Sequence, residues 1–97
     1  MELHFTGHNI ELTTPLKEYA QEKLQPLEKR DSHIIKLDVS LHVENVTHIA
    51  EATIHLRGSE LHATASAENM YAAIDLLADK SKAIVTKHKE KQISQHR

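Results

Sequence analysis

The chain has 97 residues, enough for one domain with one modest hydrophobic core. With 39% hydrophobic and 27% charged residues it has the composition of a soluble globular protein, and no window approaches the roughly 18 consecutive apolar residues of a transmembrane helix. The absence of cysteine excludes disulfides and thiolate chemistry, and the N-terminus lacks the basic start and apolar run of a signal peptide, so a cytoplasmic location is expected.

The first predicted elements are a short strand and a helix that a proline interrupts. Alternating apolar and polar residues predict a strand over residues 2–6 that ends at Gly7. Thr14 can cap a helix that starts at the following proline, and Pro26 should kink the last turn or end the regular helix near Gln25. Helical spacing predicts a buried stripe on this helix, composed of Leu16, Tyr19, Ala20, Leu24 and Leu27.

Three strands with one apolar and one polar face come next. They cover residues 34–44, 50–57 and 60–67, with a turn at 45–48 and a two-residue hairpin turn at Gly58-Ser59. The predicted inward residues are Leu37, Val39, Leu41, Val43, Ala50, Ala52, Ile54, Leu56, Leu61, Ala63, Ala65 and Ala67. Because the other face of every strand is polar, we expect helices to cover only one side of the sheet.

A long uninterrupted helix is predicted over residues 68–91, followed by a flexible tail at 92–97. At 1.5 Å per residue it would be roughly 36 Å long. A strand of about eight residues spans only about 26 Å, so the helix should overshoot the sheet by about two turns. We therefore predict a single α+β domain, residues 1–91, of order β-α-β-β-β-α. It would have a four-stranded mixed sheet with both helices on one face and the first two strands parallel.

The net charge of −2 hides a division of charge along the chain. Residues 80–97 hold six of the twelve basic residues and one of the fourteen acidic residues, a net charge of +5, whereas residues 1–79 carry −7. This pattern favours contact with a polyanion, although cations that match the negative end of a helix dipole are the simpler alternative. On a helix, Lys80, Lys87 and Lys91 form one line, and Lys82 and Lys89 form a second line about 200° away. Cations on two sides suit insertion between two phosphate walls.

Other residue types offer weaker indications. Phe5, Tyr19 and Tyr71 are the only aromatic residues, which argues against a reader of single strands by base stacking. If Gly58-Ser59 forms the hairpin turn, His55 and His62 oppose each other and could ligate zinc or copper. Two ligands are too few for a structural metal site, however. The alternative is a solvated polar face that gains charge at mildly acidic pH. The histidines predicted on the open face of the sheet are His4, His42, His55 and His62. No catalytic motif is present, so we expect no enzyme, no cofactor and no resident metal.

Several short segments resemble one known family along essentially the whole chain. They are the opening HFTG before a helix, VTH at 46–48, EATIH at 51–55, ELHA at 60–63, NMYAAID at 69–75 and KHKEK at 87–91. With these, the chain is similar to the ribosome hibernation-promoting factor family, also called the ribosome-associated inhibitor or sigma-54 modulation protein family. Because the chain stops soon after the long helix, it resembles the short form without the C-terminal dimerisation domain of the long form.

The resemblance implies a function as well as a fold. Members bind the small ribosomal subunit and its ribosomal RNA in the channel between head and body, where they occupy the tRNA sites and overlap the mRNA path. Translation in stressed or stationary cells is silenced, and the idle ribosome is preserved. The short form is associated with pairing of whole ribosomes into inactive dimers, alongside a separate ribosome modulation factor. The free protein would be a monomer without membrane contact.

The resemblance also carries over to individual positions. The RNA-binding residues it implies are Lys80, Lys82, Lys87, His88, Lys89 and Lys91, with a second cluster at Lys23, Lys29 and Arg30. Lys17 is close to that second cluster. The alternative to RNA binding by these cations is that they are solvated helix charges paired with Glu18, Glu22 and Glu28. The chain departs from the usual family residues at Asn69, Ser81 and Ala83. A module that binds structured RNA off the ribosome stays open as the alternative function.

Overall fold

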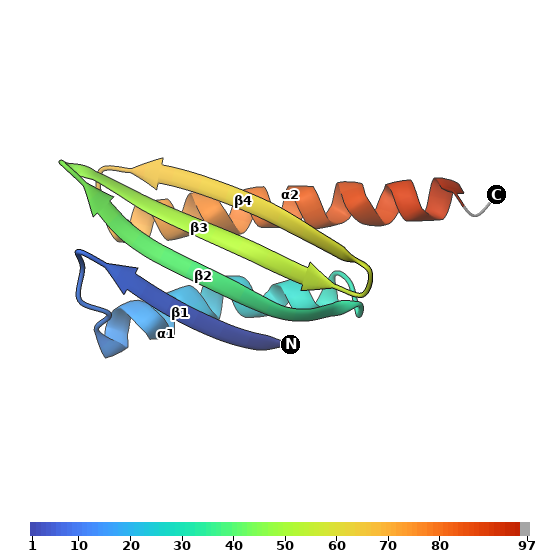
Figure 1. Cartoon of the computed structure of the whole chain (residues 1–97), viewed down its shortest axis with the longest axis horizontal. Coiled ribbons are helices and arrows are strands. Elements are labelled where there is room, and N and C mark those ends of the chain that lie inside the picture. Colours follow the sequence, from blue (N-terminus) through green and yellow to red (C-terminus); the bar gives the residue numbers. More distant parts are fainter. Residues whose placement is uncertain (96–97) are drawn as a thin grey trace.

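The computed structural model describes residues 1–95, with side chains through Lys91, and this part of the chain has the predicted order of elements (Figure 1). A short 3-10 helix is the one addition to the prediction. The elements are β1 (Glu2–His8), α1 (Thr14–Leu24), the 3-10 helix η1 (Gln25–Lys29), β2 (Ile34–Glu44), β3 (Thr47–Leu56), β4 (Ser59–Ala67) and α2 (Met70–Gln95).

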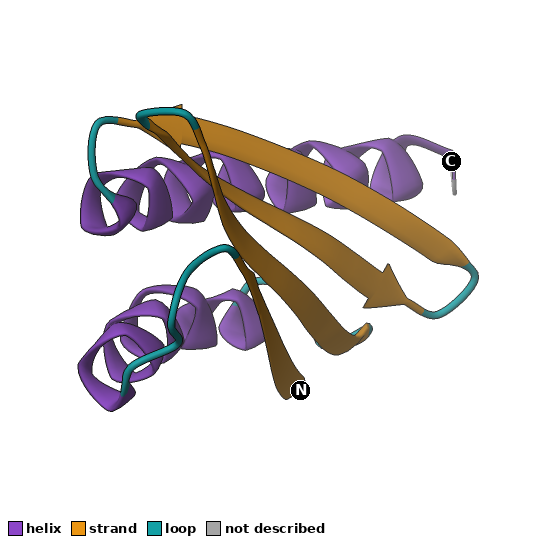
Figure 2. Ribbon diagram, turned by 60° about the vertical axis from the view of Figure 1, so that its left-hand side comes forward, coloured by secondary structure: helices purple, strands orange, loops and turns teal. Residues whose placement is uncertain are grey.

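The four strands form one mixed sheet whose order in space equals their order in the chain. β1 pairs with β2 in parallel, and the pairs β2–β3 and β3–β4 are antiparallel. Both helices lie against the same face of this sheet, and the other face is open (Figure 2). The predicted α+β class, the mixed sheet and the one-sided cover are therefore confirmed.

The core lies between the sheet and the two helices. Leu24 of α1, Leu37 and Ile54 of the central strands and Leu77 of α2 are fully buried there. Burial of one such side chain contributes about 1.5–3 kcal/mol. On β4 the inward residues are mostly alanines, which lets the backbone of α2 approach this side of the sheet.

Two details at the start of the chain differ from the prediction. β1 continues through Gly7 to His8, which pair with Leu41 and His42 of β2. The glycine has a packing role instead of ending the strand, since a Cβ there would lie 2.8 Å from Cγ of Leu12. The cap of α1 is Thr13 rather than Thr14, since the Thr13 Oγ1 accepts a hydrogen bond from the Leu16 N–H at 3.3 Å. α1 ends at Leu24, immediately before Gln25 and Pro26, as predicted.

The second hairpin has a different register from the predicted one. Its turn is Arg57-Gly58, and Gly58 has a φ of +75°, a conformation that glycine adopts without strain. The pairing moves by two residues, so every side chain stays on its predicted face while its partner across the strands changes. The first hairpin turn is also shorter than predicted, because β3 already pairs with β2 at Thr47.

α2 extends past the end of the sheet. Its start is fixed by Asn69, whose Oδ1 accepts a hydrogen bond from the Ala72 N–H at 2.9 Å. The 26 residues of α2 give a length of about 39 Å, and its C-terminal end projects beyond the β3–β4 turn (Figure 1). Residues 92–95 of the predicted tail belong to this helix, and residues 96–97 lie outside the described residues.

Candidate nucleic-acid interface

The projecting end of α2 presents basic side chains that the core does not use. Val85 is the last buried residue of the helix among those with described side chains. From Thr86 to Lys91 none is buried, and Lys87, Lys89 and Lys91 are exposed. His88 on the same segment is partly exposed. A partner can therefore reach this segment without any rearrangement of the core.

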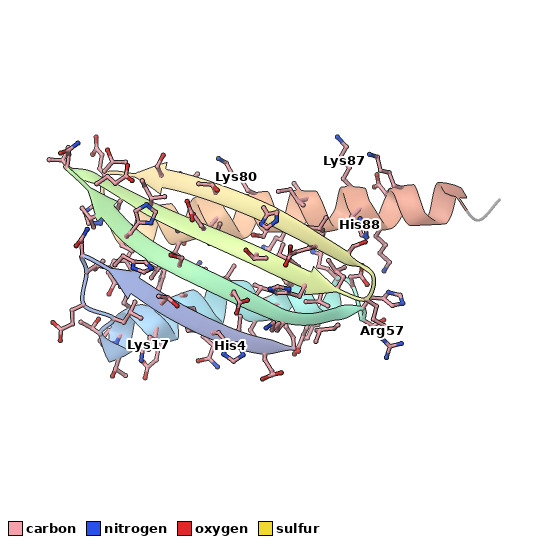
Figure 3. The ribbon with its side chains drawn as sticks, viewed as in Figure 1. His4, Lys17, Arg57, Lys80, Lys87 and His88 are labelled. Atoms are coloured by element: carbon pink, nitrogen blue, oxygen red, sulfur yellow. The ribbon has the colours of Figure 1, made fainter. Side chains whose placement is uncertain are left out.

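The cations of α2 lie on two sides of the helix. Lys80 is on the side of β4, where its Nζ donates a hydrogen bond to the Thr64 carbonyl at 2.9 Å, and Lys87 points away from the helix on the same side (Figure 3). Lys82 and Lys89 are on the side of α1 and η1. The structure thus separates the two lines of lysines that helical spacing indicates.

A shallow hollow between α1 and α2 contains charges of both signs. It has a volume of about 320 Å³ and is lined by Lys23, Asp75, Ala78, Asp79 and Lys82. The Lys23 Nζ lies 3.8 Å from the Asp75 Oδ1, so this lysine pairs with α2 and not with the acids of its own helix. Because carboxylates accompany both lysines, this hollow is less open to phosphate than the end of α2.

Tyr19 and Tyr71 pack beside this hollow and bring the two helices together. Their ring centroids are 4.9 Å apart in an edge-to-face arrangement, and the Lys23 Nζ lies 5.4 Å from the centre of the Tyr19 ring. The Tyr19 hydroxyl donates a hydrogen bond to Asp75. This hydrogen bond raises the pKa of Tyr19, with smaller contributions from burial and from the Asp75 charge. The tyrosines are therefore part of the α1–α2 contact.

The loop after η1 holds α2 at the point where the helix leaves the core. The Lys89 Nζ donates a hydrogen bond to the Arg30 carbonyl at 3.1 Å, and the Arg30 Nη1 donates one to the Thr86 Oγ1 at 3.4 Å. Two candidate RNA-binding residues thus join this loop to α2: Lys89 contacts the loop, and Arg30 contacts the helix. Lys29 is exposed next to them.

Asp31 is the buried anion of this loop. Its Oδ1 accepts hydrogen bonds from the backbone N–H of His33 and from the His33 ring, both at 2.9 Å. Burial alone would raise the pKa of Asp31, but the hydrogen bonds from His33 and the nearby charges of His33 and Lys89 outweigh it and lower the pKa. Lys89 therefore has an electrostatic partner within the chain as well as an exposed ammonium group.

Arg57 is a basic residue at this end that sequence reasoning missed. It lies in the β3–β4 turn, and its backbone N–H donates a hydrogen bond to the His33 carbonyl at 3.2 Å. The side chain is exposed at the end of the molecule toward which α2 projects (Figure 3). A cation directly before a turn glycine was the signal available, but the predicted turn, one residue too late, placed Arg57 in the strand.

The open-face histidines do not form the predicted pair. His55 lies opposite Glu60, and His62 lies opposite Thr53, so the expectation of a directly opposed His55 and His62 was wrong. In the described part of the chain, no group of three or more histidine, aspartate or glutamate residues is placed to hold a metal ion. Within the same residues, no helix is both long and apolar enough to cross a membrane.

Comparison with known proteins identifies the family. The family model for "Sigma 54 modulation protein / S30EA ribosomal protein" matches residues 3–93. The ribosome hibernation promoting factor of Salmonella typhimurium is 47% identical over 96 residues, which cover 99% of this chain and 100% of that protein. The factor of the same name from Escherichia coli K12 is 46% identical over the same shares of the two chains.

Two solved structures have the same fold. A ribosomal subunit interface protein from Coxiella burnetii superposes with a TM-score of 0.88 at 27% identity, over 93% of this chain and 99% of that chain. The N-terminal domain of Thermus thermophilus Protein Y superposes with a TM-score of 0.79 at 25% identity, over 90% of this chain and 94% of that chain. The family that the sequence resembles is thus confirmed, and it is a family of ribosome-associated factors rather than of enzymes. The chain belongs to the Sigma 54 modulation protein / S30EA ribosomal protein family.

Proposed function

We propose that this protein is a ribosome hibernation factor that binds the small ribosomal subunit and silences translation. The names of its relatives support this proposal, because proteins nearly half identical over the full chain are called ribosome hibernation promoting factors. The observation that carries it is the end of α2, which leaves the core and presents exposed lysines on a chain that is otherwise acidic.

The proposed contacts are lysine–phosphate contacts with ribosomal RNA. Such contacts depend on salt and not on base sequence, so they position a protein without reading bases. The net charge of −7 over residues 1–79 should discourage coating of arbitrary RNA, so binding should depend on a shaped site that receives the basic end. The residues we assign to this surface are Lys80, Lys82, Lys87, His88, Lys89 and Lys91, with Lys23, Lys29 and Arg30 as a second cluster.

The proposed mechanism is steric. The Cα envelope of the protein measures 47 × 21 × 18 Å, and the projecting helix is a rod about 10–12 Å in diameter. Lodged in the channel where tRNA and mRNA pass, such a body would exclude both, and no chemical step is needed. The proposal includes promotion of inactive ribosome dimers alongside a ribosome modulation factor, and it places the protein in the cytoplasm with the ribosomes.

Sedimentation with purified ribosomes tests the proposal. We expect the protein to migrate with small subunits and whole ribosomes at low salt, to dissociate at high salt, and to inhibit cell-free translation at the concentrations at which it binds. A faster-sedimenting ribosome peak on addition of the protein and a modulation factor would support dimer promotion. Protein that stays at the top of the gradient at every salt concentration would refute ribosome binding. Equal affinity for free structured RNA would favour the off-ribosome alternative.

A further inference from the structure

The open face of the sheet carries a charge that depends on histidine protonation. Its strands present five outward carboxylates, one outward lysine and five outward histidines. The carboxylates are Glu2, Asp38, Glu44, Glu51 and Glu60, the lysine is Lys36, and the histidines are His4, His8, His42, His55 and His62. With neutral imidazoles this face carries a net charge of −4, and with all five protonated it would carry +1.

His55 is at the centre of this arrangement. Its Nε2 lies 2.8 Å from the Asp38 Oδ2 on β2, and its Nδ1 lies 3.1 Å from the Glu60 Oε1 on β4. The other charged or titratable groups that face it are Lys36 on β2, His62 on β4 and Arg57 beyond the end of its own strand. Since both ring nitrogens face carboxylate oxygens, a proton on His55 would place one positive charge between two negative ones.

The other open-face histidines lie beside acids or beside each other. The distance from the His4 Nε2 to the Glu2 Oε1 is 3.5 Å, and the distance from the His42 Nε2 to the Glu44 Oε1 is 3.6 Å. The His62 Nε2 lies 3.8 Å from the Glu60 Oε2. His8 on β1 is the Cα partner of His42 on β2. Charges gained by these rings would thus appear where the negative charge of the face now lies.

We propose that this face controls how closely RNA phosphate can approach the sheet, so that ribosome binding strengthens as the pH falls. Histidine changes charge between about pH 5 and 8, and no other side chain does so at its ordinary pKa. At the upper end of this range the face repels phosphate, and only the α2 end attracts it. At the lower end the repulsion is gone. This regulation rests on the proposed function, because it needs phosphate on both sides of the bound protein.

The test is the ribosome affinity of labelled protein at about pH 7.5 and about pH 5.8, at one fixed ionic strength near 0.1 M. For charges about 8 Å from phosphate, we expect binding roughly fivefold tighter at the lower pH. A His4→Gln/His42→Gln/His62→Gln variant should lose most of this gain. These three rings are at least partly exposed, and His55, with its two hydrogen-bond partners, is kept. Comparison with wild type at the same pH removes any effect of pH on the ribosome itself.

Two further variants separate the contribution of the sheet face from that of the α2 end. His88→Gln/His96→Gln removes both histidines of residues 80–97, and it should retain most of the pH gain if the sheet face is responsible. Glu44→Gln/Glu51→Gln lowers the negative charge of the sheet face without changing any histidine, so it should tighten binding at about pH 7.5. This variant also tests the inference if the triple histidine variant does not fold.

The outcomes distinguish the inference from the proposed function. Wild-type binding that does not change with pH, or a triple variant with the full pH gain, would overturn the inference and leave ribosome binding intact. Wild-type protein that binds ribosomes at neither pH would refute the proposed function on which the inference rests.

Discussion

The two halves of α2 have the same backbone structure and opposite environments. From Met70 to Val85 a residue is buried at nearly every turn, against β3, β4 and α1. From Thr86 to Lys91 none is buried, and lysines alternate with other polar residues. One uninterrupted helix thus serves as a core element in its first half and, by our proposal, as an RNA contact element in its second. Stability and RNA affinity should therefore respond to different substitutions along the same helix.

The largest effect should follow from a cavity in the first half. Leu77→Ala removes a fully buried side chain and should lower the free energy of unfolding by about 3 kcal/mol, since the core around it can collapse only in part. Leu76→Ala is the matched control, because Leu76 is 44% exposed, and it should change the free energy by less than about 0.5 kcal/mol. Urea denaturation measures both. Similar losses for the two variants would mean that the first half of α2 is not a core element.

In the second half, we expect loss of affinity without loss of stability. Lys87→Gln/Lys91→Gln should weaken ribosome binding and lower the slope of log K against log salt by roughly 1.5, because about two phosphate contacts are lost. Lys17→Glu makes the same change in net charge at an exposed residue of α1 outside the proposed surface and should leave the slope nearly unchanged. Sedimentation or anisotropy over a salt series gives both slopes. Equal reductions would show that net charge alone, rather than the end of α2, governs binding.

A smaller effect is expected at the joint between the two halves, where Asp31 lies close to Lys89. Its lowered pKa means that the ionised form favours the folded state. That stability is present above the unfolded pKa of about 3.9 and is lost as the pH falls through the lowered folded value. Asp31→Asn should cost about 1 kcal/mol near neutral pH, and the difference from wild type should shrink toward zero near about pH 2. A difference that does not vary with pH would assign Asp31 a steric role instead.

The fold was predictable because each strand alternates and each helix has one apolar stripe. The overshoot of α2 was predictable from length alone, because helix and strand rise differ. The hairpin register was not, because a shift by two residues leaves His55 and His62 on the same face and therefore leaves no trace in an alternating pattern. Only the conformation of the turn decides it, and both Arg57-Gly58 and Gly58-Ser59 are acceptable turn sequences.

The candidate site was predictable in part. Clustered lysines and helical spacing predicted cations on two sides of α2, and the structure has them there. The hydrogen bond from Lys89 to the Arg30 carbonyl and the pairing of Lys23 with Asp75 join residues more than fifty positions apart in the chain. No local pattern encodes such contacts. The position of Arg57 beside the basic end also depends on a non-local contact, the hydrogen bond from its backbone N–H to the His33 carbonyl.

The smallest predicted effect concerns the one buried serine of α2. Ser81 is fully buried within the core half, and its Oγ has no hydrogen-bond partner in the described structure. A buried hydroxyl without a partner keeps its desolvation cost, so Ser81→Ala should raise the free energy of unfolding by about 0.5–1 kcal/mol. The midpoint of thermal unfolding should rise by a few degrees. Ribosome affinity should not change, because the Ser81 side chain is fully buried and cannot contact RNA. A loss of stability on Ser81→Ala would contradict this prediction. It would show that the hydroxyl has a hydrogen-bond partner within the helix, such as a backbone carbonyl one turn earlier.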